Sequence, residues 1–133
     1  MLSSAAEKPV CGVYAAVLTP RDANGRVDAA AFDANLAFLL DRGIRGFAIN
    51  GATGEYCLTR PEELSVLLER ANAVAGDSAR VLCGVGSAGL RDTLERCALA
   101  EAAGVHALLL PMPHFFPYSQ EDLFAYCGRW RSA

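Results

Sequence analysis

The chain has 133 residues, of which 53% are hydrophobic and 20% charged, and its formal net charge is −3 at pH 7. This length fits one domain, and the apolar content excludes an intrinsically disordered chain. Its 12 basic residues are outnumbered by 15 acidic ones and form no basic run. This balance argues against nucleic acid or an anionic membrane as a partner.

Membrane, targeting and metal signals are missing from the sequence. The longest apolar runs, Val13–Leu18 and Leu36–Leu40, are far shorter than the ~20 residues that cross a bilayer. Residues 1–9 carry no basic stretch before a long apolar run, so we expect no secretory signal. The five cysteines form neither a CxxC pair nor a Cys/His metal spacing. We therefore expect no metal, no other cofactor, and reduced, mostly buried thiols in a cytoplasmic protein.

Short apolar runs alternate with helical patterns along the chain. After a loose tail over residues 1–8, one domain is predicted over 9–133. Its first strand is expected to be buried on both faces, because its apolar run is continuous. The predicted strands cover 12–18, 46–49, 80–84 and 105–110, and the predicted helices cover 29–42, about 60–75, 91–103 and 120–129.

Capping residues mark the helix ends. Asp28 and Ser119 are suitable N-caps, and Thr59-Arg-Pro-Glu62 reads as a capping box with proline in the first turn. Gly43 and Gly104 are placed to end the first and third helices.

The predicted order is four βα units spaced by roughly 30 residues, the size of such a unit. Four consecutive parallel units fit either a small doubly wound sheet or one half of a (β/α)8 barrel. Periodicity alone leaves both architectures open.

In either fold the functional face lies beyond the carboxyl ends of the strands. The richest segment there is Gly51-Ala-Thr-Gly-Glu55, whose glycines permit close backbone approach and whose successive N–H groups could bind an anion. Thr53 adds a hydroxyl donor. A carboxylate or phosphate is the expected ligand. The alternative is a tight turn in which Glu55 is only a solvated or capping carboxylate.

The loops after the third and fourth strands add less specific signals. The glycines of Gly84–Gly89 are best explained as letting the backbone turn beneath a packed site. The loop after the fourth strand carries more aromatic side chains than a plain turn needs: His114, Phe115, Phe116 and Tyr118. These rings could line a substrate pocket or an oligomer interface. His114 lacks a carboxylate partner at an obvious spacing, which disfavours it as a general base.

Several short motifs follow one another at the strand ends: Ala16-Val-Leu-Thr-Pro20, Asn24-Gly25, Gly51-Ala-Thr-Gly-Glu55, Gly84-Val-Gly86, Pro113-His-Phe-Phe and Ser119-Gln-Glu-Asp-Leu123. In this order the chain resembles the N-terminal half of the dihydrodipicolinate synthase / N-acetylneuraminate lyase family, from about Gly12 to Arg129. The resemblance implies a (β/α)8 barrel (TIM barrel) of which about the first four βα units are present.

Members of that family are pyruvate-type class I aldolases and dehydratases that need no added cofactor. By the resemblance, Gly51, Ala52 and Thr53 would bind the carboxylate of a 2-oxo acid such as pyruvate, through backbone N–H groups and the Thr53 hydroxyl. Phe115 would lie at the substrate site, near a neighbouring subunit of a homo-oligomer.

Three departures from the family pattern change what the resemblance implies. Ala52 stands where dihydrodipicolinate synthases have a hydroxyl residue of a proton relay, and Phe115 stands where they have the relay's tyrosine. Another 2-oxo acid lyase, such as a sugar-acid aldolase or dehydratase, fits better than the lysine-biosynthetic reaction. The family's Schiff-base lysine lies on a sixth strand, and Lys8, before the first strand, cannot replace it.

Three functional hypotheses follow. We expect part of a Schiff-base lyase that is inactive as the chain stands. The alternative is a non-catalytic half-barrel module that binds 2-oxo acids or self-associates through its open sheet edges. An independent small hydrolase is disfavoured, because the sequence has no Gly-x-Ser-x-Gly motif.

Overall fold

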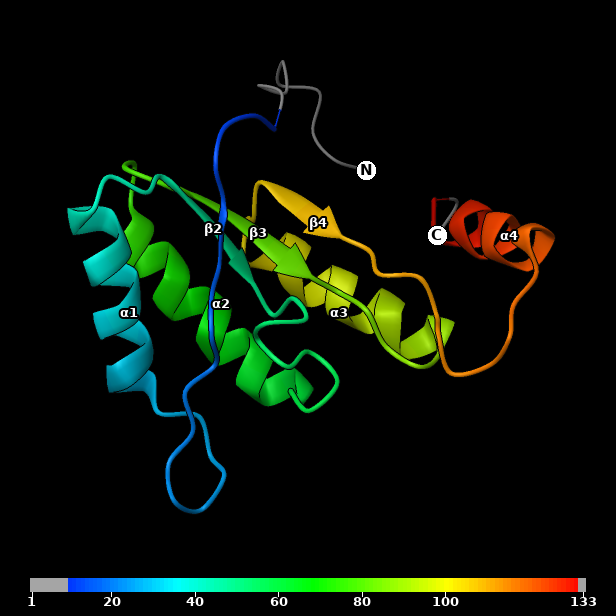
Figure 1. The fold of residues 1–133 in the computed structure, drawn as a ribbon, viewed down its shortest axis with the longest axis horizontal. Helices are drawn as coiled ribbons and strands as arrows, with labels where there is room; N and C mark the ends of the chain where they lie inside the picture. Colours follow the sequence, from blue (N-terminus) through cyan, green and yellow to red (C-terminus); the bar gives the residue numbers. More distant parts are fainter. Residues whose placement is uncertain (1–9, 132–133) are drawn as a thin grey trace.

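The computed structural model describes residues 10–131, which form four strands and four helices in strict alternation (Figure 1). The expected tail over residues 1–8, including Lys8, lies outside the described residues. In chain order the elements are β1 (Ala15–Ala16), α1 (Ala29–Asp41), β2 (Gly46–Ile49), α2 (Pro61–Ala75), β3 (Arg80–Gly84), α3 (Leu90–Ala102), β4 (Ala107–Leu109) and α4 (Gln120–Arg131).

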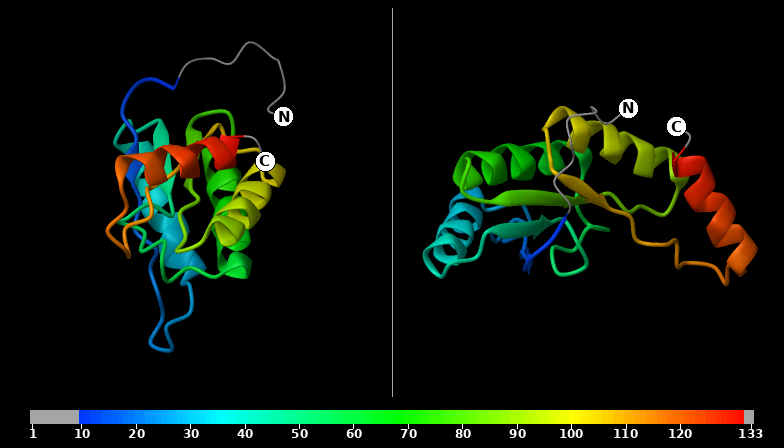
Figure 2. Two further views of the ribbon diagram at one scale, coloured as in Figure 1. Left: turned by 90° about the vertical axis from the view of Figure 1, so that its right-hand side faces the viewer. Right: turned by 90° about the horizontal axis from the view of Figure 1, so that it is seen from above.

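The four strands form one parallel sheet in the order β1-β2-β3-β4. Each strand therefore pairs with the next in sequence, and each connecting helix crosses over the same side. Figure 2 shows α1, α2 and α3 along one face of the sheet, with α4 set apart beyond α3. The predicted parallel βα architecture is confirmed, and this strand order is that of consecutive units in a (β/α)8 barrel rather than a doubly wound sheet.

The core lies between the sheet and the first three helices. Phe32 and Leu36 of α1 are fully buried in one apolar cluster with the sheet side chains Phe47 and Val81. Helix α2 contributes the predicted inward-facing leucines Leu64, Leu67 and Leu68. Burial of an aliphatic or aromatic side chain of this size contributes about 1.5–3 kcal/mol.

The first strand differs from its prediction. It is only two residues long, and Val13 and Leu18 on either side of it are 74% and 60% exposed. Among residues 10–131, β1 has a partner strand on one edge only. A continuous apolar run is buried on both faces only where both are covered, and here helices cover one face alone.

Most predicted helix ends are confirmed. The Asp28 carboxylate accepts a hydrogen bond from the Ala31 N–H at 2.9 Å. Gly43, at φ +84°, ends α1, and the Ser119 hydroxyl accepts from the Asp122 N–H at 3.2 Å. The capping box was predicted one residue too early: α2 begins with Arg60 as the N-cap, and its N–H donates to the Glu63 carboxylate at 3.0 Å.

The prediction of mostly buried thiols is wrong. Cys11 and Cys57 are exposed, Cys97 and Cys127 are half-buried, and Cys83 alone of the five is buried. Cys83 lies in β3, under the helices, whereas Cys57 lies in a loop at the open end of the sheet. Within the described part of the chain, no helix is long and apolar enough to cross a membrane.

Candidate functional site

The carboxyl ends of β2 and β3 are locked together by Asn50, the first residue after β2. Asn50 is fully buried and adopts a left-handed backbone conformation with φ 55°. Its side-chain amide donates to the Gly84 carbonyl oxygen at 2.7 Å. Because this bond fixes Asn50 against the end of β3, the glycine loop that follows, Gly51–Glu55, begins at a fixed position beyond the strand ends.

Two glycines of the next loop allow this close approach. A Cβ atom on Gly84 would lie 2.0 Å from the Asn50 carbonyl oxygen, and one on Gly86 would lie 2.1 Å from the Pro111 ring. Neither position tolerates a side chain without backbone movement. Of the glycines predicted to let the backbone turn within a packed region, Gly84 and Gly86 do lie in such close contact, whereas a Cβ atom on Gly89 would meet nothing within 4 Å.

The glycine loop is also attached to the end of the first strand. The Thr19 hydroxyl, which is buried, donates to the Gly54 carbonyl oxygen at 2.8 Å. Gly54 itself is buried, and a Cβ atom there would lie 3.0 Å from the Val17 carbonyl oxygen. The loop is therefore held by the ends of β1, β2 and β3 together.

Within the loop, backbone hydrogen bonds fold the chain into successive turns. The Glu55 N–H donates to the Ala52 carbonyl at 3.0 Å, and the Tyr56 N–H donates to the Gly51 carbonyl at 3.2 Å. Glu55 takes a φ of 56° to close the turn. Ala52 and Thr53 are exposed at its tip and Gly51 is half-buried. The turn thus leaves Ala52 and Thr53 accessible to solvent at the tip of the loop.

A charged pair lies beside the loop. Arg21, in the segment that follows β1, donates to the Glu63 carboxylate through Nη1 at 2.7 Å and through Nη2 at 3.4 Å. The hydrogen bond from Arg21 holds the pKa of Glu63 below its ordinary value. The same bond raises the pKa of Arg21, with a smaller contribution from the negative charge of Glu55. This pair holds the start of α2 against the segment between β1 and α1.

Arg96 was not among the residues singled out from the sequence, yet it connects two of the loops. It lies on α3 and is 9% exposed, with its guanidinium donating to the carbonyl oxygens of Tyr56, Gly86 and Thr59 at 2.9, 2.7 and 2.8 Å. The available signal was its spacing: Thr93, Arg96 and Ala100 share the buried face of α3.

Phe115 lies at a cavity rather than on the glycine loop. The cavity has a volume of about 240 Å³ and is lined by Tyr56, Cys57, Ser87, Ala88, Arg96, Pro113, His114 and Phe115. Phe115 is 80% exposed, and its ring packs edge-on against that of Phe116, with the two ring centroids 5.0 Å apart. Gly51, Ala52 and Thr53 are not among the lining residues, so the four predicted site residues divide between two neighbouring places.

The two histidines have different surroundings. His114 Nδ1 lies 3.5 Å from the hydroxyl of Tyr56, the residue after the glycine loop, and so connects the segment after β4 to that loop. His106 instead supports the sheet: its Nδ1 accepts from the Val81 N–H at 3.1 Å. Over residues 10–131, no group of three or more His, Cys, Asp or Glu side chains is arranged to hold a metal ion.

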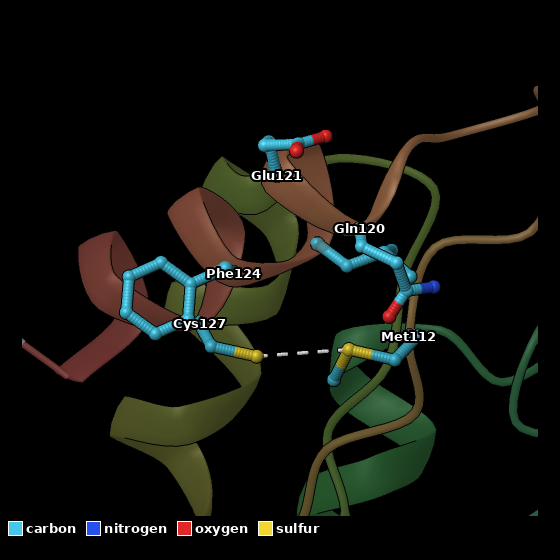
Figure 3. Close-up of a pocket in the computed structure, with 6 residues that line it drawn as sticks. Met112, Gln120, Glu121, Phe124 and Cys127 are labelled. Carbon is cyan, nitrogen blue, oxygen red and sulfur yellow. Dashed lines mark hydrogen bonds between the residues drawn. The ribbon is translucent and has the colours of Figure 1, made fainter.

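A second, wider hollow lies between α4 and the segment after β4 (Figure 3). Met112, Leu123, Phe124 and Cys127 make its surface largely apolar, with Gln120 and Glu121 at its edge. The Cys127 thiol lies 3.6 Å from the Met112 sulfur. Glu121 is the one ionisable carboxylate there and no cation lines the hollow, so it does not suit an anionic ligand.

A parallel sheet whose strands are linked by helices on one face, with a glycine loop at the strand ends, defines part of a (β/α)8 barrel. Residues 9–129 match the Dihydrodipicolinate synthetase family, and the chain belongs to that family.

Named relatives agree with this assignment. The chain is 35% identical over 126 residues to a 4-hydroxy-tetrahydrodipicolinate synthase from Acidothermus cellulolyticus, covering 95% of this chain and 41% of that protein. Among solved structures, it superposes with a TM-score of 0.78 on Proteus mirabilis N-acetylneuraminate lyase, at 29% identity, covering 86% of this chain and 39% of that one.

A prophage protein of the dihydrodipicolinic acid synthase family from E. coli K12, solved in complex with pyruvate, superposes with a TM-score of 0.83 at 25% identity. That match covers 91% of this chain and 41% of the other. The chain thus spans about two fifths of the length of the relatives it matches.

Proposed function

We propose that this chain is the part of a 2-oxo acid lyase that binds the substrate carboxylate, within a Schiff-base aldolase, dehydratase or synthase of the family. The Thr53 hydroxyl and the backbone N–H groups of Ala52 and Thr53 bind the carboxylate of pyruvate or a related 2-oxo acid. Phe115 forms a neighbouring part of the pocket wall. The amine that forms the Schiff base comes from outside the 133 residues.

The observation that carries this proposal is the placement of the glycine loop. The ends of three strands hold the loop through the Thr19, Asn50 and Gly54 contacts, while Thr53 is left exposed. Exposed backbone donors on a rigid turn bind a carboxylate with little ordering cost. The pyruvate complex of the E. coli K12 prophage protein supports pyruvate as the probe.

The reaction is proposed to differ from that of the synthases among its relatives. Ala52 and Phe115 carry no hydroxyl, so neither can donate or accept a proton in a relay. Phe115 instead adds an apolar ring beside His114 and Pro113. This combination favours a sugar-acid aldolase or dehydratase.

Carboxylate recognition is tested by calorimetric titration of the 133-residue chain with pyruvate and with acetone, its analogue without the carboxylate. Pyruvate should bind measurably and acetone should not. Equal affinity for both ligands, or binding of neither by a folded sample, would contradict the carboxylate site.

The origin of the Schiff-base amine has its own test. Lys8 is the one lysine of the sequence. Treatment with pyruvate and borohydride should add no mass to the chain, because Lys8 precedes the first strand rather than following a strand end. A reduced adduct on Lys8 would overturn this assignment.

A second candidate is a half-barrel module that self-associates. It is favoured by the exposure of Val13 and Leu18 beside β1, which pairs with one strand only among residues 10–131. Unpaired strand edges with apolar side chains tend to pair with another chain. Sedimentation at micromolar concentration distinguishes the two: a single dimer species that binds no pyruvate supports the module, and a monomer excludes it.

A further inference from the structure

Arg96 has a buried guanidinium that plays no part in the proposed function. An arginine in the interior is expensive unless its donors are satisfied. Here three backbone carbonyls accept from it: Tyr56 and Thr59 after the glycine loop, and Gly86 after β3. The side chain therefore bridges α3, the loop after β2 and the loop after β3.

The acceptors show what the bridge holds in place. Tyr56 directly follows Glu55, and its N–H donates to the Gly51 carbonyl at 3.2 Å, so the position of Tyr56 sets the closure of the glycine loop. Gly86 packs under the Tyr56 ring, since a Cβ atom added to Gly86 would lie 3.1 Å from the ring carbon Cε2 of Tyr56. By holding both carbonyls, Arg96 fixes the end of the loop whose tip carries Thr53.

The charge of Arg96 is not neutralised by a carboxylate. Among residues 10–131, Arg21 pairs with Glu63 and Arg70 pairs with Asp33, whereas no carboxylate pairs with Arg96. Its partners are neutral carbonyls. A positive charge in a partly dry environment attracts an anion bound nearby more strongly than an exposed, paired charge does.

We propose that Arg96 is a positioning residue for the glycine loop, which sets the geometry of the carboxylate site through Tyr56 and Gly86 and favours an anion there through its unpaired charge. This inference rests on the proposed carboxylate site. Lysine cannot replace Arg96, because its ammonium is a point charge without the planar guanidinium fork that reaches three carbonyls.

The test is pyruvate affinity, measured by titrating amide chemical shifts of the 133-residue chain and of three variants. Arg96→Met should raise the Kd about tenfold or more, since hydrogen bonds from a charged group that order the loop are lost. Arg96→Lys should raise it less, because the charge remains. Arg70→Met is the matched control: it removes an equal charge from α2, where Arg70 pairs with Asp33, and should leave the Kd within about twofold.

Salt dependence separates positioning and charge from a merely structural role. The pyruvate Kd of the wild-type chain and of Arg70→Met should rise with ionic strength, and that of Arg96→Met should rise less steeply. A wild-type affinity and salt dependence in folded Arg96→Met would overturn the inference while leaving the proposed function intact. If Arg96→Met does not fold, Arg96→Lys decides: a wild-type Kd in that variant overturns the inference.

Failure of the proposed function looks different. If the wild-type chain, folded by its amide spectrum, shows no pyruvate-dependent shift, the carboxylate site itself is wrong and Arg96 has nothing to position. A loss of affinity in Arg96→Met without a change in Arg70→Met supports both proposals.

Discussion

The side-chain amide of Asn50 donates to the carbonyl oxygen of Gly84 at 2.7 Å, across the ends of two neighbouring strands. Because Gly84 has no Cβ atom, the backbone of Asn50 can approach it closely and turn into the glycine loop with a left-handed φ. This one contact therefore holds the ends of β2 and β3 together and also fixes where the glycine loop begins.

Gly84→Ala should destabilise the protein by about 3 kcal/mol, since the added Cβ would overlap the Asn50 carbonyl oxygen and force backbone to move. Gly128→Ala is the matched control: its added Cβ would meet no atom within 4 Å, and alanine favours the helix by about 0.5–1 kcal/mol. Urea unfolding measures both. Equal stability of Gly84→Ala and the wild type would contradict the close approach.

The Arg21–Glu63 pair predicts a specific pH dependence of stability. The pKa of Glu63 is held below its ordinary value of 4.5 by the hydrogen bond from Arg21. A depressed carboxylate pKa stabilises the folded state at pH values above 4.5, and this contribution is lost as the pH falls through the folded-state pKa.

Glu63→Gln should therefore be less stable than the wild type at pH 7, and the difference should shrink below pH 4.5. Glu62→Gln removes the same charge from the same first turn, where Glu62 is exposed, and should show a much smaller pH-dependent difference. Thermal unfolding midpoints from pH 3 to 7 measure it. A pH-independent gap for Glu63→Gln would contradict the ion pair.

Thiol reactivity should follow burial. Burial raises the pKa of the Cys83 thiol to about 12, so this cysteine should not react with a thiol reagent until the protein unfolds. Cys11 and Cys57 are exposed and should react first. Mass spectrometry of partly labelled protein distinguishes the sites. Rapid labelling of Cys83 under native conditions would contradict the packing of β3 under the helices.

Local sequence signals predicted the elements well. Asp28, Gly43 and Ser119 act where capping chemistry places them, because caps depend on residues within one turn. The capping box was predicted one residue early because Thr59 and Arg60 both precede the helical proline. Hydrogen bonding to the Arg60 N–H decides between them.

The first strand and the cysteines show that local sequence signals do not predict side-chain burial fully. The apolar run 12–18 predicts a strand covered on both sides, yet exposure of Val13 and Leu18 depends on which elements lie over the sheet. Cys57 is exposed for the same reason, since its loop lies at the open strand ends. Burial is a property of the assembled layers and is only partly encoded in a short run of residues.

The candidate site was predicted in part. The anion-binding character of Gly51–Glu55 could be argued from glycines and Thr53, and the loop does lie at the strand ends. The role of Arg96 could not be predicted from the sequence, because its three partners lie 10 to 40 positions away along the chain. A buried arginine bonded to backbone carbonyls leaves no motif in the partners, which can be any residue type.

Amide chemical shifts of residues Ala52–Glu55 on addition of pyruvate test the account most directly. We expect shifts centred on these amides in the wild-type chain and in Thr53→Ser, which keeps the hydroxyl. Thr53→Val should bind about fivefold to tenfold more weakly, since one hydrogen bond to a charged group is lost and the exposed side chain does not support the fold. A folded sample whose Ala52–Glu55 amides stay unchanged at high millimolar pyruvate would contradict it.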